Sequence, residues 1–177
     1  MAHALVRAAR PEDDLPLCRT LMREYAAYLN RSVGDEHICI DSLEAELEGL
    51  PGPYAEPDGL ILLAFVEDRP AGCVALKPLQ PILTGERACE MKRLWVRPAF
   101  QGQGLGRLLA TEAIRRARSA EYTAMYLDTM PSTMQAASAL YIALGFVPVE
   151  RYTRNPVLRE TAGGPGVAYL RLDLLAS

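Results

Sequence analysis

The sequence predicts a single α/β (α+β) domain over residues 1–177, in which a mixed β-sheet carries helices on its faces. The main observation is that β-like apolar runs and helical apolar patterns follow one another in the order β-α-α-β-β-β-α-β-α-β-β. A second is that no repeat, low-complexity tract or linker interrupts the 177 residues, a length at which one domain can bury a substantial core.

Local signals bound the elements of the first half of the chain. Proline and acidic residues at Pro11–Asp14 favour the first turn of a helix. Asp41-Ser-Leu-Glu44 is a capping-box pattern for a second helix. A turn at Glu67–Pro70 divides two apolar runs into a hairpin. The expected elements are a strand at 4–9, helices at 11–30 and 41–50, and strands at 60–67 and 71–79.

In the second half, Pro98 closes a strand, and a glycine-spaced turn leads into a helix with apolar residues at helical spacing. Ser132-Thr-Met-Gln135 is a second capping-box pattern, for a helix that Gly145 ends. The last strand alternates its side chains at period two. The expected elements are strands at 88–97, 122–127, 146–152 and 167–175, and helices at 105–120 and 132–144.

The composition is that of an ordinary globular protein and argues against several function classes. The longest apolar run, Leu60–Val66, is too short to cross a bilayer, and the first residues do not form a signal-peptide pattern. We therefore expect a cytoplasmic protein with no membrane partner. The four cysteines are scattered and, with two histidines, make a poor metal set, so we expect reduced thiols and no metal.

The net charge of −3 hides an asymmetry along the chain. Residues 1–60 hold 12 Asp/Glu against 5 Lys/Arg, whereas residues 87–118 hold 8 Lys/Arg against Glu90 and Glu112. The basic segment indicates an anionic ligand. Nucleic acid is disfavoured as that ligand, because aromatic residues are not interleaved with the charges and the pI is about 5.5. The arginines at 115–118 are expected to coat the solvated end of a helix.

The most informative stretch joins a strand to a helix through a turn rich in glycine. Gly102, Gly104 and Gly106 let the backbone approach a ligand and point several N–H groups the same way. The following helix adds its unpaired N-terminal donors, and Arg107 in the first turn could bind phosphate. The spacing fits neither a P-loop nor GxGxxG. We expect an anion site, the alternative being that the glycines only shape a turn.

The segment Gln101-x-x-Gly104-x-Gly106 resembles the pyrophosphate-binding motif of the GNAT N-acetyltransferase superfamily. A later block, Ala139–Phe146, is similar to that family's late helix with its Leu-Gly-Phe ending. The element order also matches, so the resemblance covers nearly the whole chain. It implies a GNAT-like mixed, mostly antiparallel sheet of about seven strands flanked by about four helices. It also implies transfer of an acetyl group from acetyl-CoA, used as cosubstrate, to an amine.

The resemblance further implies roles for single residues. Tyr141 takes the place of the tyrosine that protonates the coenzyme A sulfur, and Glu90 that of a base glutamate. The alternatives are a tyrosine packed in the core and a carboxylate paired with Lys92 or Arg93. Many relatives carry Asn where this chain has Met134, and Ser138 is a neighbour that could supply the polar contact. The expected coenzyme-binding residues are Trp95, Val96, Gln101, Gly102, Gln103, Gly104, Leu105, Gly106, Arg107 and Ser138.

The acceptor amine stays open at this stage. The leading expectation is a small-molecule amine or an amino acid that attacks directly in a ternary complex. The alternatives are a protein N-terminus or lysine, and a non-catalytic acyl-CoA-binding module, against which Tyr141 and Glu90 argue. Acyl-chain length and oligomeric state, a homodimer included, are also open. Candidate acceptor-binding residues are Tyr25, Tyr28, Glu36, Asp128, Arg151, Tyr152, Arg154 and Asn155.

Overall fold

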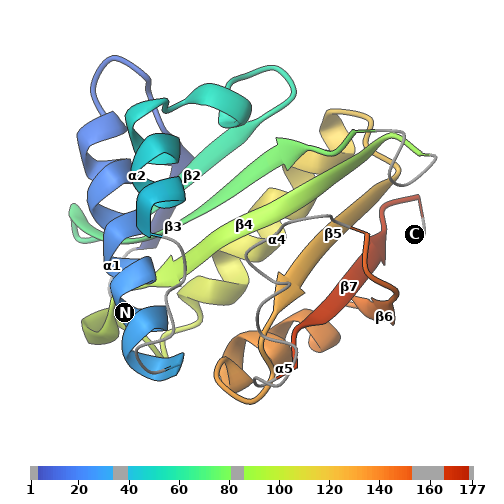
Figure 1. Ribbon diagram of the computed structural model, residues 1–177. Coiled ribbons are helices and arrows are strands. Elements are labelled where there is room, and N and C mark those ends of the chain that lie inside the picture. Colours follow the sequence, from blue (N-terminus) through green and yellow to red (C-terminus); the bar gives the residue numbers. More distant parts are fainter. Residues whose placement is uncertain (1–3, 34–39, 81–85, 153–165, 176–177) are drawn as a thin grey trace.

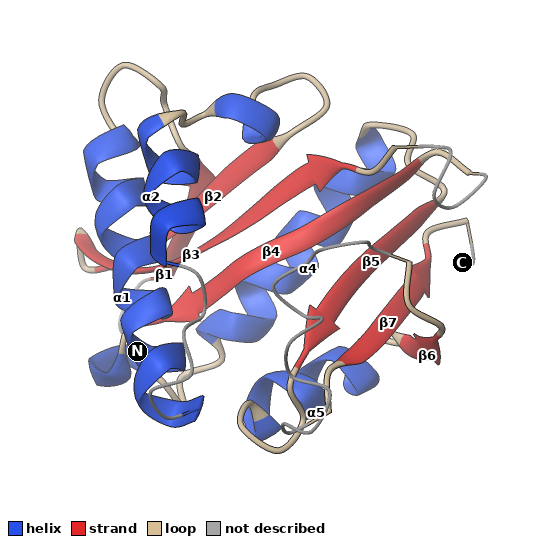
Figure 2. Cartoon of the chain, viewed as in Figure 1, coloured by secondary structure: helices blue, strands red, loops and turns tan. Residues whose placement is uncertain are grey.

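The computed structural model describes residues 4–33, 40–80, 86–152 and 166–175. These residues form a seven-stranded sheet in the order β1-β2-β3-β4-β5-β7-β6. Neighbouring strands are antiparallel except for β4 and β5, which are parallel. Helices lie on both faces of the sheet (Figure 1, Figure 2). The predicted class, a mixed and mostly antiparallel sheet flanked by helices, is confirmed, and so is the predicted element order.

The bounds of the elements follow the predicted ranges closely. The strands are β1 (Ala4–Ala8), β2 (Leu60–Val66), β3 (Arg69–Pro78), β4 (Ala88–Val96), β5 (Ala124–Thr129), β6 (Val147–Val149) and β7 (Ala168–Asp173). The helices are α1 (Leu15–Val33), α2 (Ile40–Glu48), α4 (Leu105–Ser119) and α5 (Gln135–Ala143), with 3₁₀ turns η1 (Gly52–Tyr54) and η2 (Pro98–Phe100). No described helix combines the length and hydrophobicity needed to cross a membrane.

Four local predictions differ from the structure. The helix expected from Pro11 begins at Leu15, because Asp13 and Asp14 donate their amides to the carbonyl of Arg10 in a preceding turn. The helix expected from the capping-box pattern at Asp41 already begins at Ile40. The helix expected from Ser132 begins at Gln135, and its N-cap is Met134, which makes no side-chain capping bond. The reason is a preceding turn, in which Thr133 and Met134 both donate their amides to the carbonyl of Met130. The strand expected at 146–152 shortens to β6, an edge strand that contains Pro148, a residue without an amide to donate.

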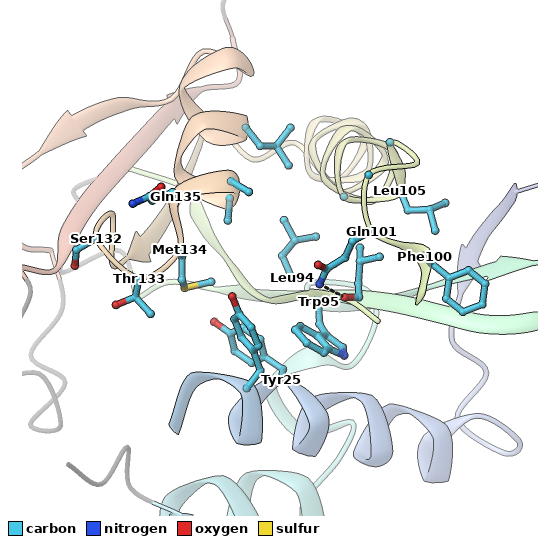
Figure 3. A pocket seen from close by; sticks show the side chains of 18 residues that line it. Tyr25, Leu94, Trp95, Phe100, Gln101, Leu105, Ser132, Thr133, Met134 and Gln135 are labelled. Atoms are coloured by element: carbon cyan, nitrogen blue, oxygen red, sulfur yellow. Dashed lines mark hydrogen bonds between the residues drawn. The ribbon is translucent and has the colours of Figure 1, made fainter. Parts of the chain in front are cut away.

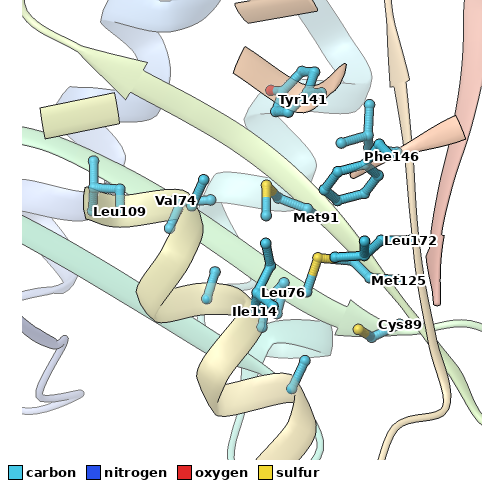
Figure 4. Close-up of a cluster of buried hydrophobic side chains, with 14 of the residues drawn as sticks. Val74, Leu76, Cys89, Met91, Leu109, Ile114, Met125, Tyr141, Phe146 and Leu172 are labelled. Carbon is cyan, nitrogen blue, oxygen red and sulfur yellow. The ribbon is translucent and has the colours of Figure 1, made fainter. Parts of the chain in front are cut away.

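Side chains that alternate along the strands build a core on each face of the sheet. On the face covered by α4 and α5, apolar side chains of β2 to β5 pack against the two helices (Figure 4). On the face covered by α1 and α2, a second core surrounds Leu21, Leu47 and Trp95. The buried face of α4 consists of Leu105, Leu109, Ala110, Ala113, Ile114 and Ala117.

The parallel strands β4 and β5 stay together over only part of their length. Pairing joins Ala88–Glu90 to Ala124–Tyr126 and then stops. Beyond that point β4 continues with β3, and β5 continues with β7. The sheet therefore opens into a wedge between Met91–Val96 and Leu127–Thr129 (Figure 1). Among the described strands, backbone groups that face the wedge are not paired across it, which leaves room there for another hydrogen-bonding partner.

Candidate active site

A cavity of about 570 Å³ lies at the mouth of the wedge. Tyr25 and Trp95 form one side of it, and the turn before α5 with Met134 lies opposite (Figure 3). The loop between η2 and α4 closes the third side with Gln101 and Leu105. Three elements distant in sequence thus meet here: helix α1, the end of β4 with its following loop, and the start of α5.

The glycine turn has the backbone geometry that the sequence predicted. Gly102 and Gly104 adopt left-handed conformations with φ of 75° and 81°. Gly104 is the N-cap of α4 and offers no side-chain cap, so the first amides of the helix are left for an external acceptor. A Cβ at Gly102 or Gly104 would meet no protein atom within 4 Å, because both glycines face open space. A diphosphate group fits this turn, since uncapped amides and a helix dipole favour an anion.

The side chains of this loop brace it. Gln101 donates from Nε2 to the carbonyl of Val96 at 2.9 Å, which ties the loop to the end of β4 (Figure 3). Gln103 similarly reaches the carbonyl of Ala99 at 3.3 Å. Both glutamines therefore shape the turn, and the amides remain as anion donors.

Seven of the ten predicted coenzyme-binding residues line the cavity. They are Trp95, Val96, Gln101, Gly102, Gly104, Leu105 and Gly106. Gln103 and Arg107 are exposed next to it but do not line it. Ser138 also lies off the cavity wall, with its hydroxyl 3.2 Å from that of Thr129. The side chains of these three residues therefore do not form part of the cavity wall.

Strand β4 carries a β-bulge at the wedge. Its register to β3 shifts between the pairs Cys73–Trp95 and Ala75–Lys92, so Arg93 and Leu94 together oppose one residue of β3. Arg93 adopts a φ of 59°. That left-handed conformation costs a non-glycine residue about 1–2 kcal/mol, so surrounding contacts must hold it.

Tyr141 is a buried residue of α5, in edge contact with Phe146 at a ring distance of 5.8 Å. Burial raises its pKa well above the ordinary value, and the nearby Tyr25 and Asp128 raise it further. Tyr141 is not part of the cavity wall, although its neighbour Leu140 is. Because its pKa is raised, the phenol is protonated at neutral pH.

Glu90 lies on the other side of the wedge and is only 3% exposed. Its carboxylate accepts a 2.9 Å hydrogen bond from Tyr152 and lies 3.2 Å from Nζ of Lys77. Lys92 is 3.5 Å from Glu90 and 3.3 Å from Asp128, so it bridges the two acids. Burial opposes the charge on Lys92, but Asp128 and Glu90 raise the pKa of its ammonium above the ordinary value.

The predicted pairing of Glu90 is thus confirmed for Lys92 and wrong for Arg93, which instead binds Glu46 at 2.7 Å. Sequence reasoning missed Lys77 as a partner. A signal for it existed, because Lys77 and Glu90 face each other across the β3–β4 pair and opposite charges favour such positions.

The acceptor candidates fall on the two sides of the wedge. Tyr25 and Tyr28 line the cavity and pack on Trp95 with ring distances of 6.3 and 5.2 Å. Burial raises the pKa of Tyr25 to about 12. Asp128 and Tyr152 belong to the polar cluster around Glu90. Glu36, Arg154 and Asn155 lie outside the described residues.

The basic segment contributes little to the anion site through its side chains. Arg97 binds Glu24, Arg115 and Arg116 bind Glu112, and Arg118 donates to the carbonyl of Leu174. The expectation that the arginines of 115–118 coat the end of the helix is confirmed.

Cys18, Cys73 and Cys89 are buried free thiols, while Cys39 lies outside the described residues. No three His, Cys, Asp or Glu side chains gather as metal ligands within the described part of the chain.

Comparison with known proteins defines the class to which this fold and site belong. Residues 18–146 match the model of the Acetyltransferase (GNAT) family, and the chain belongs to that family. It is an acetyl-CoA-dependent N-acetyltransferase. An uncharacterized N-acetyltransferase of Schizosaccharomyces pombe is 34% identical over 170 residues, which cover 96% of this chain and 94% of the relative.

Solved structures share the fold. The PaiA N-acetyltransferase of Thermoplasma acidophilum, solved in complex with coenzyme A, superposes with a TM-score of 0.69 at 17% identity, covering 97% of this chain and 99% of that one. YncA of Salmonella typhimurium, a putative acetyltransferase solved with acetyl-CoA, gives a TM-score of 0.67 at 20% identity, covering 97% and 94%.

Proposed function

We propose that this protein acetylates the primary amine of a small molecule or amino acid, by direct attack on acetyl-CoA within a ternary complex. The observation that carries the proposal is the wedge between β4 and β5. It separates a backbone anion site at the start of α4 from a compact polar cluster around Glu90 and Asp128. Two substrates bound on the two sides would meet at the wedge, which suits a bimolecular transfer.

Acetyl-CoA would bind from the side of the glycine turn. The amides of residues 102–106 and the N-terminus of α4 would hold its diphosphate. Its pantetheine arm would run along the unpaired edge of β4 at Trp95 and Val96, both of which line the cavity. Amides at the bulge would then face the thioester carbonyl and stabilise the negative charge that develops on its oxygen.

The acceptor would bind near Asp128, whose carboxylate is 25% exposed and attracts an ammonium group. Proton removal yields the neutral amine, whose nitrogen bonds to the thioester carbon as the carbon–sulfur bond breaks. The amine proton would pass to the Tyr152 oxygen while Tyr152 passes its own proton to Glu90. Tyr141 would protonate the departing sulfur. The second proton, which the nitrogen loses on becoming an amide, would leave to water, and Tyr141 would take its own proton back from that water.

The burial of the polar cluster supports a small acceptor. Tyr152 is 8% exposed and Glu90 3%, so the groups assigned to proton removal are nearly closed off by the protein. A peptide acceptor would need an open groove leading to them. A module that only binds acyl-CoA needs neither a proton acceptor such as the Tyr152–Glu90 pair nor a proton donor such as Tyr141. The presence of these groups therefore favours an enzyme.

The test begins with calorimetric titration of the purified protein with acetyl-CoA, using NADH and ATP as controls. We expect selective binding of acetyl-CoA. Turnover is then measured by thiol release with a panel of small amines, amino acids, and peptides carrying a free N-terminus or lysine. Acetylation of small amines or amino acids supports the proposal. If only peptides are acetylated, the acceptor is a protein N-terminus or lysine and the small-molecule proposal is wrong. Binding of acetyl-CoA without turnover on any acceptor would favour a sensing module.

A further inference from the structure

The bulge of β4 is tied to helix α2 by one carboxylate. Glu46 accepts hydrogen bonds from Arg93 at Nε (3.2 Å) and Nη2 (2.7 Å), and a third from the hydroxyl of Tyr54 (2.7 Å). The Arg93 side chain is 16% exposed and that of Glu46 23%. On the backbone, the carbonyl of Arg93 accepts a bond from the Cys73 thiol at 3.5 Å. We call Glu46, Tyr54 and Arg93 the bulge clamp.

The bulge changes which face each following residue of β4 occupies. Met91 packs in the core under α4, and so does Leu94, although a regular strand would put residues 91 and 93 on the same face. Arg93 turns toward α2 instead, as the extra residue of the bulge. Trp95 consequently enters the core under α1, where its indole N–H bonds Glu24.

This change of phase sets the wall of the cavity. Leu94 and Val96 line it from the α4 side, with Trp95 on the α1 side. Without the bulge, every residue after Arg93 would point to the opposite face, because side chains alternate with a period of two. The large indole of Trp95 would then stand where Leu94 is now.

Resting on the proposed function, we infer that Glu46 is a positioning residue: it holds Arg93 in its left-handed conformation and so fixes the β4 backbone against which the thioester binds. Glu46 touches neither substrate. It acts through Arg93, and Tyr54 orients its carboxylate. Loss of Glu46 leaves the largely buried guanidinium of Arg93 without its partner. Moving that cation toward water then lowers the free energy, and the β4 backbone at Arg93 shifts with it.

The test compares Glu46→Ala with a double variant, Glu46→Ala/Arg93→Gly. Glycine takes a positive φ freely and removes the unpaired cation, so the double variant restores the bulge without the clamp. Glu44→Gln is the matched control, because Glu44 lies on the same helix and pairs with Arg23 at 2.7 Å on the exposed surface. The readouts are the calorimetric Kd for acetyl-CoA, kcat, the KM for the amine, and the melting temperature, with crystal structures of the variants.

We expect Glu46→Ala to weaken acetyl-CoA binding and lower kcat by about tenfold each, with little change in the KM for the amine. The double variant should recover most of the binding, and Glu44→Gln should match the wild type. A folded Glu46→Ala protein that binds acetyl-CoA like the wild type would overturn the inference. So would a double variant that folds but recovers no binding, because a merely structural role predicts no rescue.

Two contingencies keep the test decisive. If Glu46→Ala does not fold, Glu46→Gln takes its place as the single variant. If the wild type itself does not bind acetyl-CoA, the proposed function fails. The crystal structures of the variants then decide separately whether Glu46 holds the bulge at Arg93. A bulge unchanged at Arg93 in the single variant would overturn the inference, whereas a shifted bulge that returns in the double variant would sustain it.

Discussion

Tyr152 and Glu90 are 62 residues apart in the chain, yet the phenol donates a 2.9 Å hydrogen bond to Oε1 of the carboxylate. Lys77 and Lys92 flank the same carboxylate, and Glu90 is only 3% exposed. A base in this setting can receive a proton only through one of its partners. Tyr152 is the partner that can both give and accept a proton, which makes the pair a relay.

The relay predicts unequal losses from its two members. Glu90→Gln should lower kcat by about a hundredfold, because it removes the final proton acceptor. Tyr152→Phe should cost about tenfold, since a water molecule can partly replace the hydroxyl. Steady-state kinetics with a fixed amine measures both. Tyr126→Phe is the control: its ring lies 4.7 Å from that of Tyr152, but its hydroxyl binds Glu86. Activity of Glu90→Gln equal to that of the wild type would rule out the relay.

Tyr141→Phe should lower kcat by about a hundredfold and leave the Kd for acetyl-CoA nearly unchanged, because the proposed role of the phenol is confined to protonating the leaving sulfur. Its raised pKa keeps the proton in place through the alkaline range. The kcat of the wild type should therefore not fall between about pH 8 and pH 10 through ionisation of this group.

Tyr122→Phe serves as the control for this substitution. Tyr122 is also a buried tyrosine under α4, but its hydroxyl binds the carbonyl of Asp58, in a different part of the structure. We expect Tyr122→Phe to change stability and to keep kcat. Equal losses of kcat in the two variants would mean that Tyr141 matters for packing alone.

Gly104→Ala tests the anion site. The substitution forces alanine into a φ of 81°, which costs about 1–2 kcal/mol of stability, and places a methyl group where the diphosphate would approach. We expect the Kd for acetyl-CoA to rise by tenfold or more, about 1.4 kcal/mol. Gly52→Ala is the matched control, because Gly52 also has a positive φ and open space around its Cβ position but lies in η1. Equal binding by both variants would contradict the site.

The fold was predictable because its main determinants are local. Apolar periodicity fixes each strand and helix, and the turn residues at Pro98 and Gly145 mark their ends. The turn before α4 was predictable for the same reason, because glycines at alternate positions permit the left-handed backbone found at Gly102 and Gly104. The start of α5 was not, because the turn at Met130 overrides the capping-box pattern of Ser132.

The contacts around the wedge were harder to predict from the sequence. The pairing of Glu46 with Arg93 joins residues 47 positions apart, and no local pattern selects that partner among many acids. The cavity wall likewise depends on the bulge, which shifts the phase of a strand whose composition looks regular. Lys77 is the exception, because the β3–β4 hairpin register places it opposite Glu90.

Gly72→Ala should damage the same part of β4 from the neighbouring strand. A Cβ at Gly72 would lie 2.3 Å from the carbonyl oxygen of Trp95, so β3 and β4 must separate at the cavity wall. We expect a loss of about 1–3 kcal/mol in the free energy of unfolding, measured in urea, together with weaker acetyl-CoA binding. Gly49→Ala is the control, because its Cβ would make only ordinary contacts with helix carbonyls. Unchanged stability of Gly72→Ala would show that the strands adjust freely.

The ion pair of Glu24 with Arg97 predicts how stability depends on pH. Arg97 donates to Glu24 from Nε at 2.9 Å and Nη2 at 2.8 Å, and Trp95 adds an indole N–H at 3.3 Å. The hydrogen bonds from Arg97 outweigh burial and lower the pKa of Glu24 below its ordinary value. A lowered pKa stabilises the folded state above the unfolded pKa of about 4.3, and this contribution is lost as the pH falls through the folded value.

Urea unfolding of the wild type and Glu24→Gln across pH therefore has a defined outcome. The wild type should be the more stable protein by a constant margin from about pH 6 to pH 8, and the margin should shrink below about pH 4 as Glu24 takes up a proton. Glu56→Gln, a change at an exposed side chain on the opposite end of the sheet, is the control and should leave stability nearly unaltered. A margin for Glu24→Gln that stays constant into acid would mean that the carboxylate is held by packing, because an ion pair must weaken when its anion is neutralised.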